Sequence, residues 1–226
     1  MRRITLLVLT MLATLATPVT AQEIVYEEVI EEVVATPEQG SQRFVSALPA
    51  PVPQGIARFG PFRVLDDGRA ALVDVTDERS PAQFAAMLAA FPGIAVIEMI
   101  DCPGTEEDRA NLRLGRMIRA RGLMTHVPRG GSVRSGGVEL FLAGAKRSAD
   151  PGAEFAVHSW ADEDGREPDD YAADAPENRA YLDYYREMGM TPAQAAAFYA
   201  MTNSVPHEDA MWLTAADMRR WAKLDS

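Results

Sequence analysis

The chain has 226 residues, of which 47% are hydrophobic and 24% are charged, a balance typical of globular proteins. Its 16 glycines and single cysteine exclude a collagen-like or disulfide-rich chain, and its apolar content excludes disorder over most of its length. The formal charge of −11 repels nucleic acid and anionic membranes, so neither is expected as a partner.

The first residues have the pattern of a secretory signal peptide. Arg2 and Arg3 give a positive start, residues 4–16 are almost wholly apolar, and Val19-Thr20-Ala21 offers small residues to a signal peptidase. The run is short for a membrane span, although an uncleaved anchor is the alternative. Cleavage after Ala21 removes two arginines and no acidic residue, which leaves a formal charge of −13. We therefore expect a periplasmic or secreted protein that is free of the membrane after processing.

Residues 22–57 predict an acidic linker. Six glutamates and one arginine are followed by Pro49, Pro51 and Pro53, and a proline-rich segment favours an extended chain. A folded domain is expected from residue 58 to residue 226.

The first half of this domain begins with residues 62–65 and 70–75, which predict strands around the turn Asp66-Asp67-Gly68. Ser80 and Pro81 are typical of an N-cap and first helical position, so a helix is expected to about residue 91. The apolar run 94–100 predicts one buried strand. Thr105 is the predicted N-cap of the next helix, which Gly122 ends.

The second half continues the alternation of strands and helices. Residues 123–127 predict a short strand, residues 128–134 a loop, residues 135–144 a helix and residues 154–157 a strand. After an acidic loop, helices are expected over 177–188, 192–202 and 215–223, with Thr191 and Thr214 as caps. The alternation indicates an α/β fold with helices packed on a sheet.

Three features in this order can carry acyl-transfer chemistry. Ser135 opens a helix, where unpaired N–H groups and a positive dipole suit an oxyanion, although its position alone favours a plain N-cap. His158 ends a strand and borders a loop cluster, although many such histidines are structural. Gly104 follows Pro103 after the apolar strand and permits close approach of a ligand to the backbone.

Taken together, the motifs resemble a known family. They are an apolar strand, Asp101-Cys102-Pro103-Gly104, a helix, a strand ending at Pro128, Ser135-Gly136-Gly137, residues 141–147 and Phe155-Ala156-Val157-His158. This order is similar to the proteolytic subunit of the Clp protease and its relatives, within the crotonase-type superfamily. The resemblance extends over about residues 94–224, and the 23-residue spacing from Ser135 to His158 is close to that of the family.

The resemblance implies a fold of the Clp-protease and crotonase type and assigns roles to five residues. Ser135 would be the nucleophile, His158 the general base, and the amides of Gly104 and Gly136 the oxyanion hole. The third triad member would be Asn203, which lies nearest the expected place, or Glu208 or Asp209. Two departures are Thr105, where the family has a second glycine, and the amide of Asn203, which stabilises an imidazolium less than a carboxylate does.

The implied function is an exported serine hydrolase, specifically a serine peptidase acting on peptides or proteins. One alternative is an inactive relative that binds peptides or partners, and another is crotonase-type acyl-CoA chemistry, which the scarcity of basic residues disfavours. A Ser–Lys dyad is disfavoured for Lys146 and stays open for Lys223. No cofactor or metal is expected, because the three histidines and Cys102 lack zinc spacing and loop 162–177 lacks an EF-hand pattern. A homo-oligomer is compatible with the resemblance, since Clp-type subunits form rings.

Overall fold

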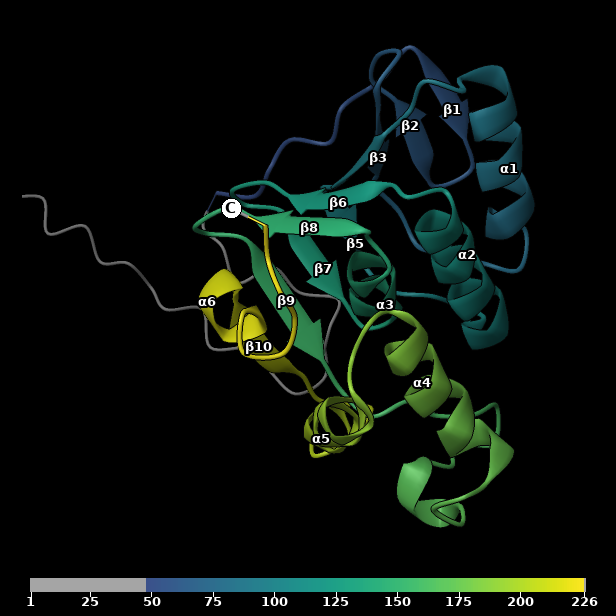
Figure 1. The fold of residues 1–226 in the computed structure, drawn as a ribbon, viewed down its shortest axis with the longest axis vertical. Coiled ribbons are helices and arrows are strands. Elements are labelled where there is room, and N and C mark those ends of the chain that lie inside the picture. The colour runs from purple at the N-terminus through teal and green to yellow at the C-terminus, as the bar shows by residue number, and fades with distance from the viewer. Residues whose placement is uncertain (1–47, 226) are drawn as a thin grey trace, which may run out of the picture. The chain divides into compact units, whose positions relative to one another are not determined.

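The computed structural model describes residues 48–225, which contain two mixed β-sheets and six α-helices (Figure 1). The predicted signal peptide and most of the predicted linker lie outside these residues. No helix within residues 48–225 is long and apolar enough to cross a membrane. The mixture of strands and helices confirms the predicted α/β class.

The larger sheet has six strands in the order β1-β2-β3-β4-β6-β8. Their bounds are β1 (Ala57–Phe59), β2 (Phe62–Val64), β3 (Arg69–Leu72), β4 (Val96–Met99), β6 (Met124–Val127) and β8 (Lys146–Ala149). The pairs β1–β2 and β2–β3 are antiparallel, and the pairs from β3 to β8 are parallel.

The smaller sheet has four strands in the order β10-β9-β7-β5. They are β5 (Asp101–Cys102), β7 (Ser132–Arg134), β9 (Glu154–Val157) and β10 (Met211–Thr214). Strands β5, β7 and β9 are parallel, and Asp101 pairs with Ser132, which pairs in turn with Glu154. Because the three strands are in register, their carboxyl ends meet at one edge of the sheet.

The helices pack around and between these sheets. They are α1 (Ser80–Ala90), α2 (Asp108–Ala120), α3 (Gly136–Leu142), α4 (Pro176–Glu187), α5 (Pro192–Thr202) and α6 (Ala215–Met218), with a 3₁₀ turn at η2 (Pro168–Asp170). Helix α3 contacts β6 of the larger sheet and β7 and β9 of the smaller one. Figure 1 shows α1 and α2 side by side and α6 next to β10.

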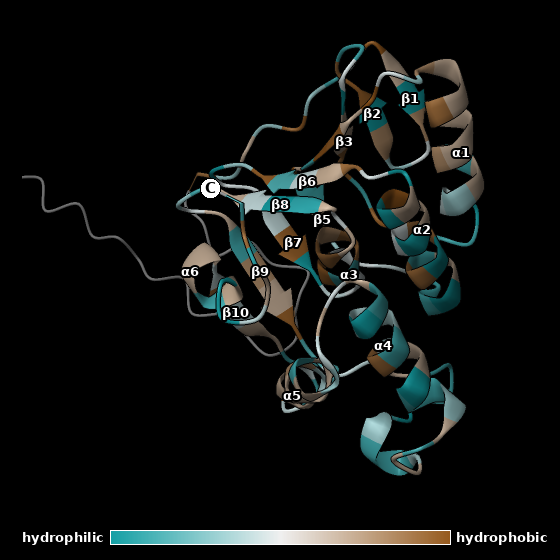
Figure 2. Ribbon diagram, viewed as in Figure 1, coloured by the Kyte–Doolittle hydropathy of each residue, from teal (hydrophilic) through white to brown (hydrophobic). Residues whose placement is uncertain are grey.

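Helix α3 lies in the centre of the core. Val138, Leu140, Phe141 and Leu142 are at most 1% exposed, and the rings of Phe141 and Phe155 are 4.9 Å apart. Burial of each such side chain stabilises the fold by about 1.5–3 kcal/mol. Figure 2 shows α3 as hydrophobic, whereas α4 carries mostly hydrophilic residues. Because α3 is buried and contacts strands of both sheets, the position of its first residues is fixed by the core.

Several predicted elements are confirmed, including β2, β3, β9, α1 and α5. Thr191 and Thr214 are N-caps, as expected, and each accepts a hydrogen bond from the backbone N–H three residues later. The other two predicted caps are wrong. The N-cap of α1 is Arg79, and that of α2 is Glu107, whose carboxylate accepts from two backbone N–H groups of the first turn.

Several other predictions are corrected. The strand predicted over residues 94–100 is shorter, because β4 covers Val96–Met99, and the next strand, β5 (Asp101–Cys102), lies in the other sheet where a loop was expected. Residues 132–134 form the buried strand β7 rather than a loop, and β8 and β10 were not expected. The last helix, α6, ends at Met218 instead of residue 223.

Candidate active site

The carboxyl ends of three neighbouring parallel strands bring the predicted site together. Gly104 lies two residues after β5, Ser135 directly follows β7, and His158 directly follows β9. The Ser135 N–H donates to the Ala156 carbonyl at 2.9 Å, which extends the β7–β9 ladder by one bond. The carboxyl ends of parallel strands are where ligands bind in open α/β sheets.

Ser135 has an unusual backbone conformation. Its φ of 49° and ψ of −130° make it the one non-glycine residue with positive φ within residues 48–225. Such a conformation costs about 1–3 kcal/mol and is common at functional sites. The Ser135 side chain makes no capping hydrogen bond to α3. This differs from the plain N-cap interpretation of the sequence, because the hydroxyl is not used by the helix.

Gly104 packs closely against Ser135, and Gly136 packs closely against Thr105 and Asn111, so a side chain at either position would collide with its neighbours. A Cβ on Gly104, which has a φ of +136°, would lie 3.0 Å from Ser135 Cβ and 3.3 Å from its Oγ. A Cβ on Gly136 would lie 2.7 Å from Thr105 Cγ2 and 2.9 Å from Asn111 Nδ2. Within residues 48–225 neither glycine amide has a hydrogen-bond partner, and Gly136 lines the cavity beside Ser135, whereas Gly104 is buried behind it.

A buried network ties the two glycines together. Asn111 Nδ2 donates to the Gly136 carbonyl at 2.7 Å, and Asn111 Oδ1 accepts from Thr76 Oγ1 at 3.0 Å. The Thr76 N–H donates to the Gly104 carbonyl at 3.1 Å. Asn111 and Thr76 are 2% and 1% exposed. The sequence analysis missed both, although Asn111 is a polar residue on the apolar face of α2, which is a detectable signal.

Two further side chains support the sheet below the site. Arg134, 2% exposed, donates to Asp101 at 2.7 Å, which joins β7 to β5 just before Ser135 and Gly104. Cys102, 1% exposed, directs its Sγ toward the Leu72 carbonyl at 3.6 Å. The last residues of β5 and β7 are therefore held by buried contacts.

His158 is oriented by a backbone carbonyl. Its Nδ1 lies 2.7 Å from the Ser159 carbonyl, which can only accept, so Nδ1 carries the proton and Nε2 of the neutral ring is free as a base. His207 Nδ1 lies 2.9 Å from the same oxygen, and the two rings are 4.7 Å apart. Burial and the neighbouring His207 lower the pKa of His158, against the hydrogen bond to Ser159, which raises it.

Asn203 does not meet the imidazole in this structure. Its amide donates to the Tyr199 carbonyl at 2.8 Å, and within residues 48–225 it makes no hydrogen bond to His158. Ser159 therefore supplies the orienting oxygen that the sequence analysis expected from Asn203. Glu208 and Asp209 are outside the set of residues that line the cavity beside His158.

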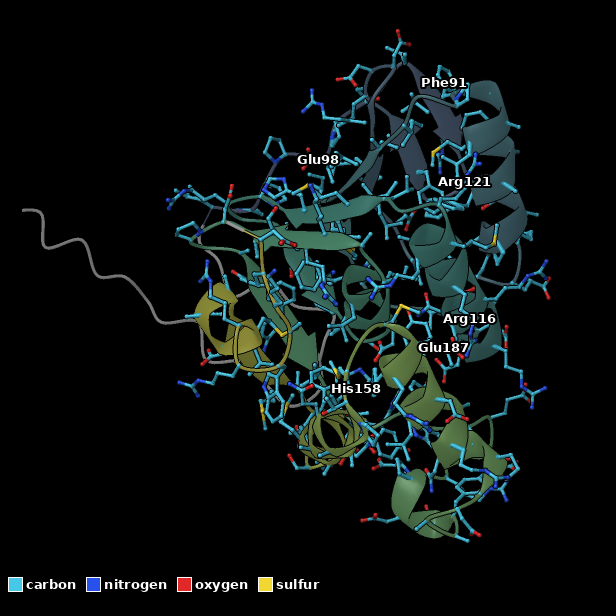
Figure 3. All side chains as sticks on the ribbon, in the orientation of Figure 1. Phe91, Glu98, Arg116, Arg121, His158 and Glu187 are labelled. Carbon is cyan, nitrogen blue, oxygen red and sulfur yellow. The ribbon has the colours of Figure 1, made fainter. Side chains whose placement is uncertain are left out.

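Ser135, Gly136, His158 and Asn203 line one cavity of about 830 Å³. Figure 3 shows His158 at the end of β9 beside α5. Within residues 48–225 the Ser135 hydroxyl makes no hydrogen bond, so the structure does not bring it into hydrogen-bond contact with His158, although both residues line this cavity. No lysine of residues 48–225 lines the cavity, which argues against a Ser–Lys dyad with Lys146 or Lys223.

The other walls of the cavity are aromatic and acidic. The aromatic lining residues are Trp160, Tyr171, Tyr181, Tyr185 and Tyr199. The acidic lining residues are Glu106, Glu107, Asp108, Glu139, Asp162, Glu163, Asp164 and Glu177. The tyrosines of α4 were expected to be core residues, whereas Tyr181 and Tyr185 also face this cavity. Such a mixture of aromatic and charged side chains suits a polar, partly apolar ligand such as a peptide.

Neither a family model nor a curated protein matches the sequence. Two solved proteases show limited structural similarity to it. A variant of ClpP1 from Listeria monocytogenes is 16% identical, with a TM-score of 0.49 over 69% of this chain and 87% of its own. The 1510-N membrane protease specific for a stomatin homolog from Pyrococcus horikoshii is 14% identical, with a TM-score of 0.44 over 69% and 70% of the two chains. At these identities the two structures assign no role to Ser135 or His158.

Proposed function

We propose that this chain is an exported serine hydrolase that cleaves peptide bonds with Ser135 as nucleophile and His158 as general base. The main support is that Gly104, Ser135 and His158 follow the ends of three adjacent parallel strands. The Clp-type order of motifs agrees with this assignment, and the signal-peptide pattern of residues 1–21 supports the exported location.

The proposed reaction has two stages. Ser135 Oγ attacks the carbonyl carbon of the substrate while its proton passes to Nε2 of His158. The free N–H groups of Gly104 and Gly136 stabilise the oxyanion of the tetrahedral intermediate. The C–N bond then breaks, and the leaving amine takes the proton from His158. Water attacks the acyl-enzyme in the second stage, which releases the acid and restores Ser135.

Ser159 replaces a carboxylate in this scheme. Its carbonyl holds the Nδ1 proton of His158 and so fixes the tautomer that leaves Nε2 basic. A neutral carbonyl stabilises the imidazolium less than an ionised carboxylate does. We therefore expect slower turnover than a Ser-His-Asp site gives.

Labelling with a fluorophosphonate probe tests the proposal. The processed protein should gain the mass of one probe on the peptide that contains Ser135, and Ser135→Ala and His158→Ala should abolish the gain. Ser204→Ala is the matched control, since Ser204 is an exposed serine just after α5 whose hydroxyl donates to the Met201 carbonyl. Absence of labelling in a folded protein contradicts the proposal and favours an inactive peptide-binding relative.

Acyl-CoA chemistry is a weaker candidate. Eight carboxylates line the cavity, against Arg109 and Arg166, and carboxylates repel the phosphates of CoA. Arg166 is already paired with Asp162 and Asp164 at 2.8 and 3.0 Å. The cavity therefore favours substrates without negative charge.

A further inference from the structure

We propose that this cavity selects peptides with a basic side chain beside the scissile bond, and that Glu139 is the residue that determines this specificity. The inference rests on the proposed function, because Ser135 defines where the scissile bond lies. It goes further by naming the class of substrate.

Glu139 is placed to receive a cation. It lies four residues after Ser135 and one turn into α3, which is about 6 Å along the helix axis. The long stem of a lysine or arginine side chain extends over a comparable distance. A residue whose carbonyl carbon meets Ser135 could therefore reach Glu139 with its charged end.

The Glu139 carboxyl is only partly satisfied by the protein. It is 7% exposed, and its Oε1 accepts from the Tyr185 hydroxyl at 2.7 Å. Within residues 48–225 no side chain donates to its Oε2, although Glu139 lines the cavity. Its own backbone N–H also bonds to the carboxyl, but Tyr185 is the one side-chain donor to it among the described residues. A buried carboxyl with so few donors that lines a cavity can accept a charged hydrogen-bond donor.

Among the described residues, no cationic side chain forms an ion pair with Glu139. Burial raises its pKa to about 7, and the Tyr185 hydroxyl opposes that rise. Asp108, which begins α2 and also lines the cavity, has a raised pKa for the same reason, and Tyr181 donates to it. A bound ammonium or guanidinium would favour the ionised form of both carboxyls.

The aromatic wall suits the same ligand. Trp160 stacks on Tyr181 with ring centroids 6.2 Å apart and planes 6° apart, and the face of an aromatic ring attracts a cation. The chain itself provides an example, since the Arg166 guanidinium lies 5.2 Å from the Tyr171 ring and pairs with Asp162. One guanidinium therefore already binds between a ring and a carboxylate in this cavity.

Two matched peptides test the inference by binding. A fluorescein-labelled peptide with one arginine is compared with the same peptide carrying citrulline, which has the same shape without the charge. The Ser135→Ala protein is used so that neither peptide is cleaved, and binding is followed by fluorescence anisotropy. We expect the arginine peptide to bind about tenfold more tightly.

Glu139→Gln should reduce this preference to about twofold, because glutamine keeps the acceptor for Tyr185 and removes the charge. Asp67→Asn is the matched control, since Asp67 is exposed, lies in the β2–β3 turn and does not line the cavity, and it should keep the tenfold preference. Equal binding of the two peptides, or no binding of either, overturns the inference.

The inference and the proposed function can fail separately. Loss of fluorophosphonate labelling with an arginine preference retained would reject the hydrolase and keep the basic specificity as that of a binding protein. Labelling of Ser135 together with equal affinity for arginine and citrulline peptides would keep the hydrolase and reject Glu139 as its specificity residue.

Discussion

At the residue scale, the backbone of Ser135 is more informative than its hydroxyl. A serine that only capped α3 would have an extended backbone and a side chain bonded to the helix. Ser135 has neither, because its φ is 49° and its hydroxyl makes no capping bond. The strained backbone instead holds the Ser135 side chain beside Gly104, and Ser135 lines the cavity.

This strain predicts that, at position 135, glycine gives a more stable protein than alanine, which is the reverse of the usual order. Ser135→Ala should leave the free energy of unfolding almost unchanged, because no cap is lost and the strain stays. Ser135→Gly should be more stable than Ser135→Ala by about 1 kcal/mol, since glycine adopts positive φ freely. Urea unfolding of both variants measures the difference, and an alanine variant as stable as the glycine variant would contradict the strained backbone.

The pKa of His158 gives a second prediction. Burial lowers this pKa below the ordinary value of 6.5, so the neutral base persists at lower pH. The rate of fluorophosphonate labelling should therefore fall only below pH 6.5 as the solution is acidified.

His207→Gln tests the cause of that shift. Because the neighbouring His207 also lowers the pKa of His158, its removal should move the acid limb of the labelling rate to higher pH. A limb that moves to lower pH, or a wild-type limb above pH 6.5, would contradict the assignment.

His126 gives a prediction about stability, because its pKa is raised whereas that of His158 is lowered. Its Nδ1 lies 2.5 Å from Glu98 Oε2, and this contact with Glu98 raises the pKa of His126. A raised pKa in the folded state means that the ion pair stabilises the fold fully below pH 6.5 and that this contribution is lost as the pH rises through the folded value. The difference in unfolding free energy between the wild type and His126→Gln should therefore shrink above pH 6.5, and a constant difference would contradict the pair.

At the scale of elements, the hydrogen bonds of Thr76 and Asn111 connect α2 to Gly104, after β5, and to Gly136, at the start of α3. Asn111→Ala removes two buried hydrogen bonds, which should cost about 2 kcal/mol. It should also slow labelling of Ser135 by roughly tenfold or more, because the oxyanion donors are no longer held.

A control separates positioning from stability. Leu114→Ala truncates a fully buried residue of the same helix at a cost of about 2–5 kcal/mol, without touching either glycine. Its labelling rate should equal that of the wild type wherever the protein is folded. A slow Leu114→Ala variant would show that the rate follows general stability instead of the Asn111 contacts.

Elements with regular local signals were predictable from the sequence. Pro192 and the cap Thr191 define the start of α5, and residues 154–157 form β9 within the expected bounds. Strand β7 was missed because its Ser132 and Arg134 are polar, and only their tertiary partners explain their burial: Arg134 donates to both Ser132 and Asp101. A short strand between two parallel neighbours carries no alternating pattern to detect.

The candidate site was predictable in part from the sequence. The order of Gly104, Ser135 and His158 in the chain suggested the site, and the structure sets them at adjacent strand ends. The partner of His158 was not predictable, because a backbone carbonyl such as that of Ser159 has no sequence signature. Neither was strand β5, since Asp101–Cys102 is only two residues long and has no apolar pattern of its own.

At the scale of the whole molecule, the first 21 residues give a prediction about processing. The pattern of Arg2-Arg3, an apolar run and Val19-Thr20-Ala21 predicts that the mature protein begins at Gln22. Intact-mass analysis of the exported protein should show loss of residues 1–21. A mass that retains them would indicate an anchored protein.

The burial of Cys102 means that the reactivity of its thiol can report local opening of the sheet. Cys102 is the chain's one cysteine, and it directly precedes Pro103 and Gly104. Burial raises the pKa of its thiol. A thiol reagent therefore cannot modify Cys102 while β5 stays paired with β7. The rate at which a thiol reagent modifies Cys102 under native conditions therefore measures how often β5 separates from β7 in such excursions. A ligand that bridges the amides of Gly104 and Gly136 should make those excursions rarer. The rate would then report occupancy of the cavity for any compound, including one that is never cleaved.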